Sequence, residues 1–172
     1  MAVRPILLIT DPVLRAPAAP VTAFGKPLRA LVKEMMRTLH AAPGRAGLAA
    51  PQIGESVRVI VYDDGTGLRG HLVNPRLELS EQGQDGDEGC LSAPGVWAPL
   101  RRAYAVVARG HDAYGKPAKV RLTGQMARCL QHELDHLDGV LFVDRLDERH
   151  RAAAQREIDE RWPPVPAGDA LS

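Results

Sequence analysis

The sequence has few cysteines and almost no excess of either charge, and each shortage excludes a class of protein. Only two cysteines, Cys90 and Cys129, occur in 172 residues, which is too few for a scaffold held by disulfides and is typical of a reducing cytosol. The 22 basic and 21 acidic residues nearly cancel, so no overall field favours nucleic acid or an anionic membrane as a partner. We therefore expect a cytoplasmic protein without direct nucleic-acid binding.

Long apolar runs and aromatic residues are also scarce. No stretch approaches the roughly 20 apolar residues of a membrane span, and the apolar run in MAVRPILLIT is shorter than that of a signal peptide. Because aromatics make up only 4% of the chain, the core must rely on Leu, Val, Ile and Ala. The length fits one domain, which we expect over residues 1–162, with a flexible C-terminal tail over residues 163–172.

Apolar periodicity predicts an α+β fold. Helices are expected at residues 27–42, 125–137 and 147–162, and strands at residues 57–63, 72–79, 103–110, 119–124 and 140–146. Pro75 interrupts the second strand, which suits an edge or a bulge. Residues 80–95 are rich in glycine and poor in apolar side chains, so they are expected to form a loop. Strands and helices that do not alternate regularly indicate mixed or antiparallel β-sheets around a central helix.

The stretch QHELDH (131–136) carries the strongest chemical pattern. Residues four apart on a helix share one face, with Cβ atoms roughly 5–6 Å apart, so His132 and His136 can bind one metal ion. Glu133 lies about 100° further round the helix and suits a general base acting on a metal-bound water. The alternative is a surface helix that carries two histidines by chance. The other histidines, at positions 40, 71, 111 and 150, are expected to be structural or solvated.

A catalytic metal site needs a third protein ligand and an open position. The long zinc-protease motif would place histidine at Phe142, where it is missing, and Glu157 belongs to a charged segment with few apolar anchors. Cys90, in the glycine-rich stretch DEGCLSAPG, is the better candidate because thiolate is a strong ligand for zinc and Fe(II). For Cys90 alone, and for Cys129, the alternative is a small buried apolar residue.

Three separated stretches together resemble the signature motifs of the peptide deformylases. They are GLAAPQ (47–52), EGCLS (88–92) and HELDH (132–136), and the resemblance extends over roughly residues 4–146. It implies a single catalytic domain with deformylase-like β-sheets around a central metal-binding helix. It also implies a metal-dependent hydrolase that removes the N-formyl group from the formyl-methionine of nascent bacterial polypeptides and releases formate. A transient association with the ribosome is a further expectation of the resemblance.

The resemblance also assigns chemical roles by matching positions. One divalent ion, Fe(II) in vivo with zinc, nickel or cobalt able to replace it, would be held by Cys90, His132 and His136. Glu133 would accept a proton from the attacking water and return it to the leaving amine. The Gln52 side-chain amide and the Leu91 backbone N–H would stabilise the charge that grows on the carbonyl oxygen. A turn-capping amide is the alternative role for Gln52.

Substrate contacts follow from the same matching positions. Gly47 would contact the peptide backbone as in β-augmentation, and Glu88 would form an orienting ion pair with Arg102. The methionine pocket would be lined or bordered by Ala46, Gly86, Gln125, Arg128 and Cys129. Two features depart from the family pattern: Arg45 in GRAGLAA, and the polar character that Gly86 and Gln125 give the pocket. We therefore hypothesise a weakened methionine selectivity.

Three other classes of protein share part of these motifs. A biosynthetic or specialised deformylase or deacylase would act on a different N-formyl or N-acyl amine through the same metal chemistry. A zincin-like endopeptidase would use His132, Glu133 and His136 but would not need Cys90. A noncatalytic paralog could keep the fold, although it would have little reason to keep Glu133 and Gln52 together with all the ligands.

Overall fold

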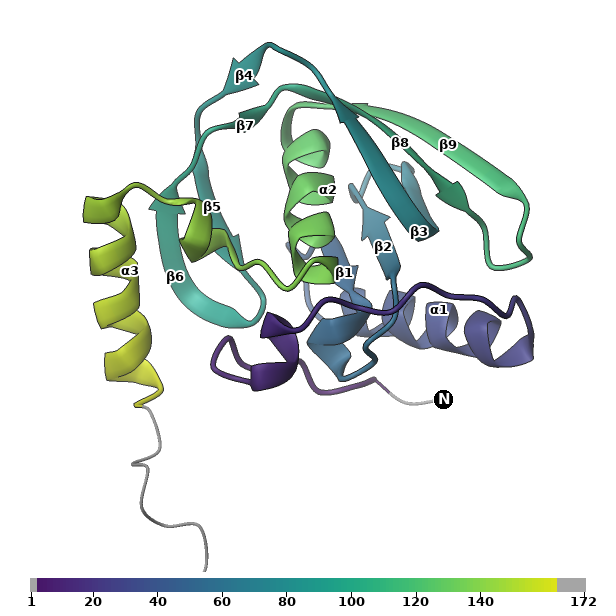
Figure 1. The fold of residues 1–172 in the computed structure, drawn as a ribbon, viewed down its shortest axis with the longest axis horizontal. Helices are drawn as coiled ribbons and strands as arrows, with labels where there is room; N and C mark the ends of the chain where they lie inside the picture. Colours follow the sequence, from purple (N-terminus) through teal and green to yellow (C-terminus); the bar gives the residue numbers. More distant parts are fainter. Residues whose placement is uncertain (1–2, 164–172) are drawn as a thin grey trace, which may run out of the picture.

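Antiparallel strands surround one central helix in this computed structural model, which describes residues 3–163 (Figure 1). The helix is α2 (Gly124–Leu137). A five-stranded sheet has the order β1-β2-β3-β8-β9, with the bounds β1 Gly47–Ala49, β2 Val59–Asp63, β3 Arg69–Leu79, β8 Ala105–His111 and β9 Pro117–Thr123. The remaining strands of the described residues form two separate pairs: β4 (Gly83–Gln84) with β7 (Arg102–Ala103), and β5 (Asp87–Cys90) with β6 (Ala93–Pro99). The predicted α+β fold is confirmed.

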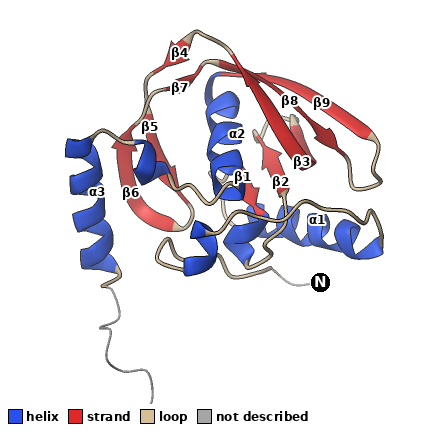
Figure 2. Cartoon of the chain, in the orientation of Figure 1, coloured by secondary structure: helices blue, strands red, loops and turns tan. Residues whose placement is uncertain are grey.

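Helix α2 lies between the large sheet and the β5–β6 pair, as Figure 2 shows. It begins after Thr123, and Gly139, with φ 71°, follows its C-terminal end, as a left-handed residue commonly does. Apolar residues of its sheet-facing side, including Ala127 and Leu130, pack against β2, β3 and β8. Its charged residues Arg128 and Glu133 are buried as well, which places polar chemistry in the interior, where it must be paired or functional.

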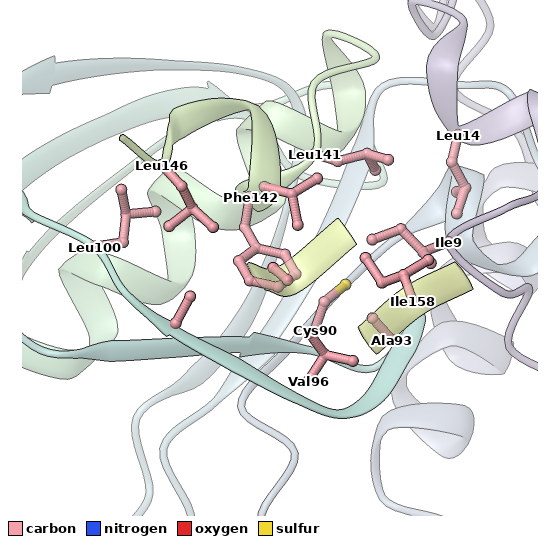
Figure 3. Packing of buried hydrophobic residues seen from close by; sticks show 13 residues of the cluster. Ile9, Leu14, Cys90, Ala93, Val96, Leu100, Leu141, Phe142, Leu146 and Ile158 are labelled. Atoms are coloured by element: carbon pink, nitrogen blue, oxygen red, sulfur yellow. The ribbon is translucent and has the colours of Figure 1, made fainter. Parts of the chain in front are cut away.

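The other long helices confirm two predictions. The predicted helix 27–42 corresponds to α1 (Lys26–Leu39), whose apolar side packs on β1 and β2. The predicted helix 147–162 corresponds to α3 (Glu148–Arg161). We expected α3 to be weakly anchored, yet Ala154 and Ile158 are buried in a cluster that also contains Cys90, and several members of this cluster are labelled in Figure 3. Two buried apolar residues therefore anchor this charged helix.

Strand β3 confirms the prediction drawn from its proline. The pairing of β3 with β8 shifts register between Val73 and Arg76, and Asn74 in this bulge has a positive φ of 51°. The proline has no N–H to donate to a neighbouring strand, so it is tolerated where the ladder is interrupted.

Two predictions of local structure were wrong. Residues 80–95 do not form a loop, because they contain β4, β5 and the beginning of β6. Their glycines and charged residues show no apolar alternation, so the sequence did not indicate strands. These short strands are defined by pairing with residues 93–103. Residues 140–146 do not form a strand, because Phe142–Arg145 is a short 3₁₀ helix, η3. Two further 3₁₀ helices, η1 (Pro12–Arg15) and η2 (Ala50–Ile53), occur in the described chain.

Apart from Pro163, the predicted tail of residues 163–172 lies outside the described residues. Within residues 3–163, none of the helices combines the length and the apolar character that crossing a membrane requires.

Candidate metal centre

Three side chains from two separate elements converge at the end of β5 and on α2. Cys90, His132 and His136 are all buried, and each offers one ligand atom within 4.8 Å of the other two. The Sγ atom of Cys90 lies 3.2 Å from Nε2 of His136, and the two imidazole rings are 4.9 Å apart between centroids. Residue 90 thus meets two histidines that lie more than 40 residues later in the chain.

The donor set fits a divalent transition metal. In a tetrahedral site with metal–sulfur and metal–nitrogen bonds of about 2.3 and 2.0 Å, neighbouring donor atoms lie roughly 3.3–3.6 Å apart. The distance of 3.2 Å between Cys90 and His136 is close to this range. A thiolate with two imidazoles suits Zn or Fe(II), and three protein ligands leave a position for water or substrate.

Glu88 orients one of the candidate ligands. Its Oε1 atom lies 2.7 Å from Nδ1 of His132. Burial alone would raise the pKa of Glu88, but hydrogen bonds from His132 and Arg102 lower that pKa to about 2. Because the carboxylate is therefore ionised, Nδ1 of His132 is the donor, which leaves Nε2 as the nitrogen that can bind a metal in exchange for its proton.

The Glu88 carboxylate is held in turn by two arginines. Arg102 donates to both carboxylate oxygens, at 3.0 and 2.7 Å, so the predicted ion pair of Glu88 with Arg102 is present. Arg128 donates to Oε2 at 3.2 Å. Arg102 also donates to Asp135 at 2.8 Å, and Arg145 donates to the same carboxylate. A buried chain of alternating charges therefore leads from His132 to the half-exposed Arg145.

The thiol and imidazole shift each other's protonation. Burial alone would raise the pKa of Cys90, but the imidazoles of His136 and His132 outweigh it, so this pKa lies well below its ordinary value. Burial alone would lower the pKa of His132, but the charge of Cys90 and hydrogen bonds with Cys90 and Glu88 raise it well above its ordinary value. The site therefore favours a thiolate, the form of cysteine that binds metals.

Glu133 lies beside these candidate ligands, and one of its carboxylate oxygens has no hydrogen-bond partner among the described residues. This oxygen is Oε2, which is buried. Burial is the largest influence on the pKa of Glu133, which rises to about 7 although the two histidines oppose the shift. A carboxylate with a pKa near neutrality can both accept and return a proton at pH 7.

Gly47 on β1 allows this approach of the helix. A Cβ atom at position 47 would lie 2.5 Å from Sγ of Cys129 and 2.7 Å from Oε1 of Glu133, which is closer than van der Waals contact allows. Only glycine therefore lets β1 pass directly over the helix at Glu133.

Gln52 makes a capping contact, and its predicted catalytic role stays a prediction. Its Oε1 atom accepts the backbone N–H of Ala49 at 2.9 Å, which is the capping role. Its Nε2 atom donates to Oγ of Ser92 at 3.2 Å and lies 3.7 Å from Sγ of Cys90. Because Ala49 orients the amide, the donating nitrogen faces the candidate ligands.

A cavity of about 330 Å³ opens beside these groups. It is lined by residues 44–47 before and at the start of β1, by β5 and β6, and by α2. Strand β1 forms one edge of the large sheet, and its first residue, Gly47, belongs to this wall. The cavity also contains residues assigned to chemistry by sequence: Cys90, Leu91, His132 and Glu133.

Known proteins share this sequence and this arrangement. The family model for polypeptide deformylases matches residues 3–152. A peptide deformylase of Acidothermus cellulolyticus is 59% identical over 160 residues, which cover 93% of this chain and 88% of that protein. The chain belongs to the peptide deformylase family. It is therefore a hydrolase of the deformylase type, and the resemblance seen in the three motifs is confirmed.

Solved structures of the family share the fold. A crystal structure of a peptide deformylase from Legionella pneumophila superposes with a TM-score of 0.86 at 41% identity, covering 93% of this chain and 95% of that one. The peptide deformylase from Thermus thermophilus superposes with a TM-score of 0.85 at 39% identity, covering 92% and 96%.

The residues that the resemblance assigned to the substrate pocket line the cavity, with the exception of Gly86. The lining residues among them are Ala46, Gly47, Glu88, Gln125, Arg128 and Cys129. Gly86 is not among the lining residues, since its Cα faces the Arg128 guanidinium, 3.2 Å from where a Cβ would stand. Arg45 also lines the cavity, although its guanidinium donates to the Thr38 carbonyl at 2.7 Å. Arg45 is thus tied to the end of α1 rather than free at the rim.

Three further residues in or near the candidate site were not predicted from the sequence. Ser92 is fully buried and accepts the hydrogen bond of Gln52. Asp135, inside the HELDH motif, is buried between Arg102 and Arg145. Its spacing of three residues from His132 could have indicated that it lies near the same face of the helix. Trp97 lines the cavity although it is 65% exposed, and no sequence pattern marked it.

Proposed function

We propose that the protein uses one divalent metal ion, Fe(II) in the cell, to hydrolyse the N-formyl group of formyl-methionine at the start of nascent polypeptides, releasing formate. The observation that carries this proposal is the close approach of Cys90 to His136, 3.2 Å between Sγ and Nε2, with His132 in the same cluster. An endopeptidase of the zincin type has no use for the cysteine. The family membership supports the deformylase chemistry.

The metal would lower the pKa of a water toward ~7 and polarise the formyl carbonyl. Glu133, with its pKa of about 7, would accept the proton of the attacking water and return it to the leaving amine. Nε2 of Gln52 and the backbone N–H of Leu91 would donate to the carbonyl oxygen as negative charge grows there. Glu88 would keep His132 in the tautomer that binds metal.

The peptide would bind along the free edge of β1. Gly47 lies at the start of this edge strand and lines the cavity, so its backbone can pair with an extended peptide. The β5–β6 pair lines the cavity as well, which leaves the first side chain of the peptide pointing toward Arg128 and Cys129 on α2.

The decisive experiment combines metal analysis with an activity assay. Protein purified without oxygen is expected to contain one equivalent of iron and to release formate from formyl-Met-Ala-Ser. Protein that contains iron and leaves this peptide intact would contradict the proposal. Activity that is lost with a chelator and restored by Fe(II) would tie the reaction to the metal.

A specialised deformylase acting on another N-formyl amine is the second candidate, and one observation favours it. Arg128 is buried in the cavity wall and donates to Glu88, to the Leu100 carbonyl and to the Gln84 carbonyl. A guanidinium there leaves less apolar surface for a methionine side chain. We therefore propose weak methionine selectivity; a preference of about 100-fold or more for formyl-Met over formyl-Ala and formyl-Lys peptides would disprove it.

The variant Arg128→Leu tests this pocket directly. It removes the polar head and leaves an aliphatic wall, so we expect the ratio of kcat/KM for formyl-Met over formyl-Ala peptides to rise about tenfold or more, as one or two buried methylenes typically allow. Arg101→Leu is the matched control, because Arg101 is exposed and pairs with Asp85 outside the cavity. An unchanged ratio in the first variant, or an equal rise in the control, would show that Arg128 does not set selectivity.

A further inference from the structure

A buried serine contacts the Gln52 amide from the strand pair that carries Cys90. Ser92 lies in the turn between β5 and β6 and is fully buried. Its Oγ atom accepts a hydrogen bond from Nε2 of Gln52 at 3.2 Å. Because a buried hydroxyl is costly without a hydrogen bond, this contact holds the two side chains together.

The Gln52 amide is held at both of its ends. Its Oε1 atom accepts the N–H of Ala49 at 2.9 Å, while Ser92 accepts one hydrogen of Nε2. An amide nitrogen carries two hydrogens, so a second N–H remains. Sγ of Cys90 lies 3.7 Å from this nitrogen. The terminal torsion of a glutamine is broad by nature, so contacts at both ends are needed to fix the direction of the second N–H.

A short N-terminal segment ties the backbones of the two residues together. The N–H of Leu7 donates to the Gln52 carbonyl at 2.8 Å. Two residues later, the N–H of Ile9 donates to the Ser92 carbonyl at 2.7 Å. Ile9 is also buried in the cluster that contains Cys90 (Figure 3). The side-chain contact between the serine and the glutamine is therefore supported by backbone hydrogen bonds on both sides.

We propose that Ser92 is a positioning residue that acts through Gln52. Its hydroxyl holds one N–H of the amide, so that the other N–H meets the formyl oxygen as negative charge grows there. Donors that are oriented before the reaction stabilise a transition state without a cost of reorganisation. The inference rests on the proposed function, in which Gln52 donates to that oxygen.

Replacing Ser92 with alanine is expected to lower kcat for formyl-Met-Ala-Ser about tenfold with little change in KM, since a 1 Å misplacement of a reacting group can cost up to about 100-fold. The metal content should stay at one equivalent. The backbone N–H of Ser92 lies 3.4 Å from Sγ of Cys90, and alanine keeps that N–H. The substitution therefore isolates the hydroxyl.

A double-mutant cycle shows whether Ser92 acts through Gln52. Gln52→Leu removes the amide and alone should lower kcat about 10²–10³-fold. Adding Ser92→Ala to it should change kcat by less than about twofold, because the group that the serine positions is already absent. A further tenfold decrease in the double variant would show that the two residues act independently, which overturns the proposal.

The side-chain amide of Gln52 gives a readout that does not depend on activity. In NMR spectra of the zinc-loaded full chain, the Nε2 proton bound to Ser92 should resonate downfield of its position in a free amide. In Ser92→Ala this proton is expected to move upfield, because it has lost its acceptor. The signal is assigned by its absence from Gln52→Leu. An unchanged Gln52 amide in Ser92→Ala overturns the proposal.

Ser80→Ala is the matched control. The Ser80 hydroxyl donates to the Gln82 carbonyl at 2.9 Å and accepts the Ala105 N–H at 3.0 Å, and Ser80 does not line the active-site cavity. We expect this variant to keep the kcat of the unaltered chain even where its thermal stability decreases. An equal decrease of kcat in Ser80→Ala and Ser92→Ala would indicate a general loss of stability and would overturn the proposal.

Failure of the proposed function gives a different result from failure of this inference. If the metal-loaded unaltered chain releases no formate, the proposed function fails, while an upfield shift of the Gln52 amide in Ser92→Ala still supports the orienting role of the serine. If formate is released and the effects in the cycle add, the proposed function stands and the role of Ser92 is wrong.

Discussion

Replacing Cys90 with alanine is expected to abolish both metal binding and deformylase activity. The change leaves His132 and His136 as the remaining ligands, and two imidazoles do not complete a catalytic site. The loss of metal affinity should exceed the roughly 10–100-fold that follows from changing residues that only orient ligands. Metal content by mass spectrometry and formate release measure the two effects.

Cys129→Ala is the matched control for this experiment. Cys129 is also a buried cysteine and lies on the same helix as the two histidines, but it does not belong to the cluster of candidate ligands. Burial raises the pKa of its thiol well above the ordinary value, so it stays protonated and is a poor ligand. We expect this variant to keep its metal. An active Cys90→Ala protein would instead indicate chemistry of the zincin type.

Replacing Glu133 with glutamine is expected to separate metal binding from catalysis. The side chain keeps its shape but cannot accept and return a proton, and general acid–base catalysis typically contributes about 10²–10⁴-fold. We therefore expect kcat/KM for formyl-Met-Ala-Ser to decrease by about that factor, while the metal content stays at one equivalent. Parallel measurements of metal content and formate release would show this.

Glu157→Gln is the control for Glu133. Glu157 is the glutamate that a different zinc-protease layout would use as a ligand, yet it lies on α3 and pairs with Arg161, outside the cavity. Its replacement should change neither the metal content nor the rate. Retention of more than about one tenth of the activity by Glu133→Gln would show that another group transfers the proton.

The polar network behind His132 shows how a candidate metal ligand can be buried with its neighbouring charges paired. Glu88 receives hydrogen bonds from Arg102, Arg128 and His132, and Asp135 balances Arg102. A buried charge is costly unless it is paired and hydrogen-bonded. Because the network pairs each of these charges, the orientation of His132 is held before a metal binds.

Local patterns predicted the elements that have strong periodicity or a strong motif. The helix at 125–137 and its stacked histidines followed from a spacing of four residues, and the helix at 27–42 followed from its apolar face. The bulge in β3 followed from Pro75. These features depend on backbone geometry over a few neighbouring residues, and the spacing of residues in one sequence is enough to predict such local geometry.

The strands within residues 80–95 could not be predicted in the same way. Strand β5 contains Asp87, Glu88 and Gly89, which have low preference for strands, and it exists because β6 pairs with it. The 3₁₀ helix at Phe142–Arg145 likewise depends on packing, since Phe142 and Val143 are buried against the Cys90 cluster. In both segments, contacts distant in sequence outweighed local preference.

The sequence by itself determined the types of the candidate ligands and the helix that presents two of them, because a spacing of four residues needs no tertiary contact to place both imidazoles on one face. The tertiary structure decided that Cys90 completes the cluster, that Glu88 is ionised and orients His132, and that Arg128 fills the space beside Gly86. Distances between residues on separate elements, and the burial that shifts their pKa values, arise only when the chain packs.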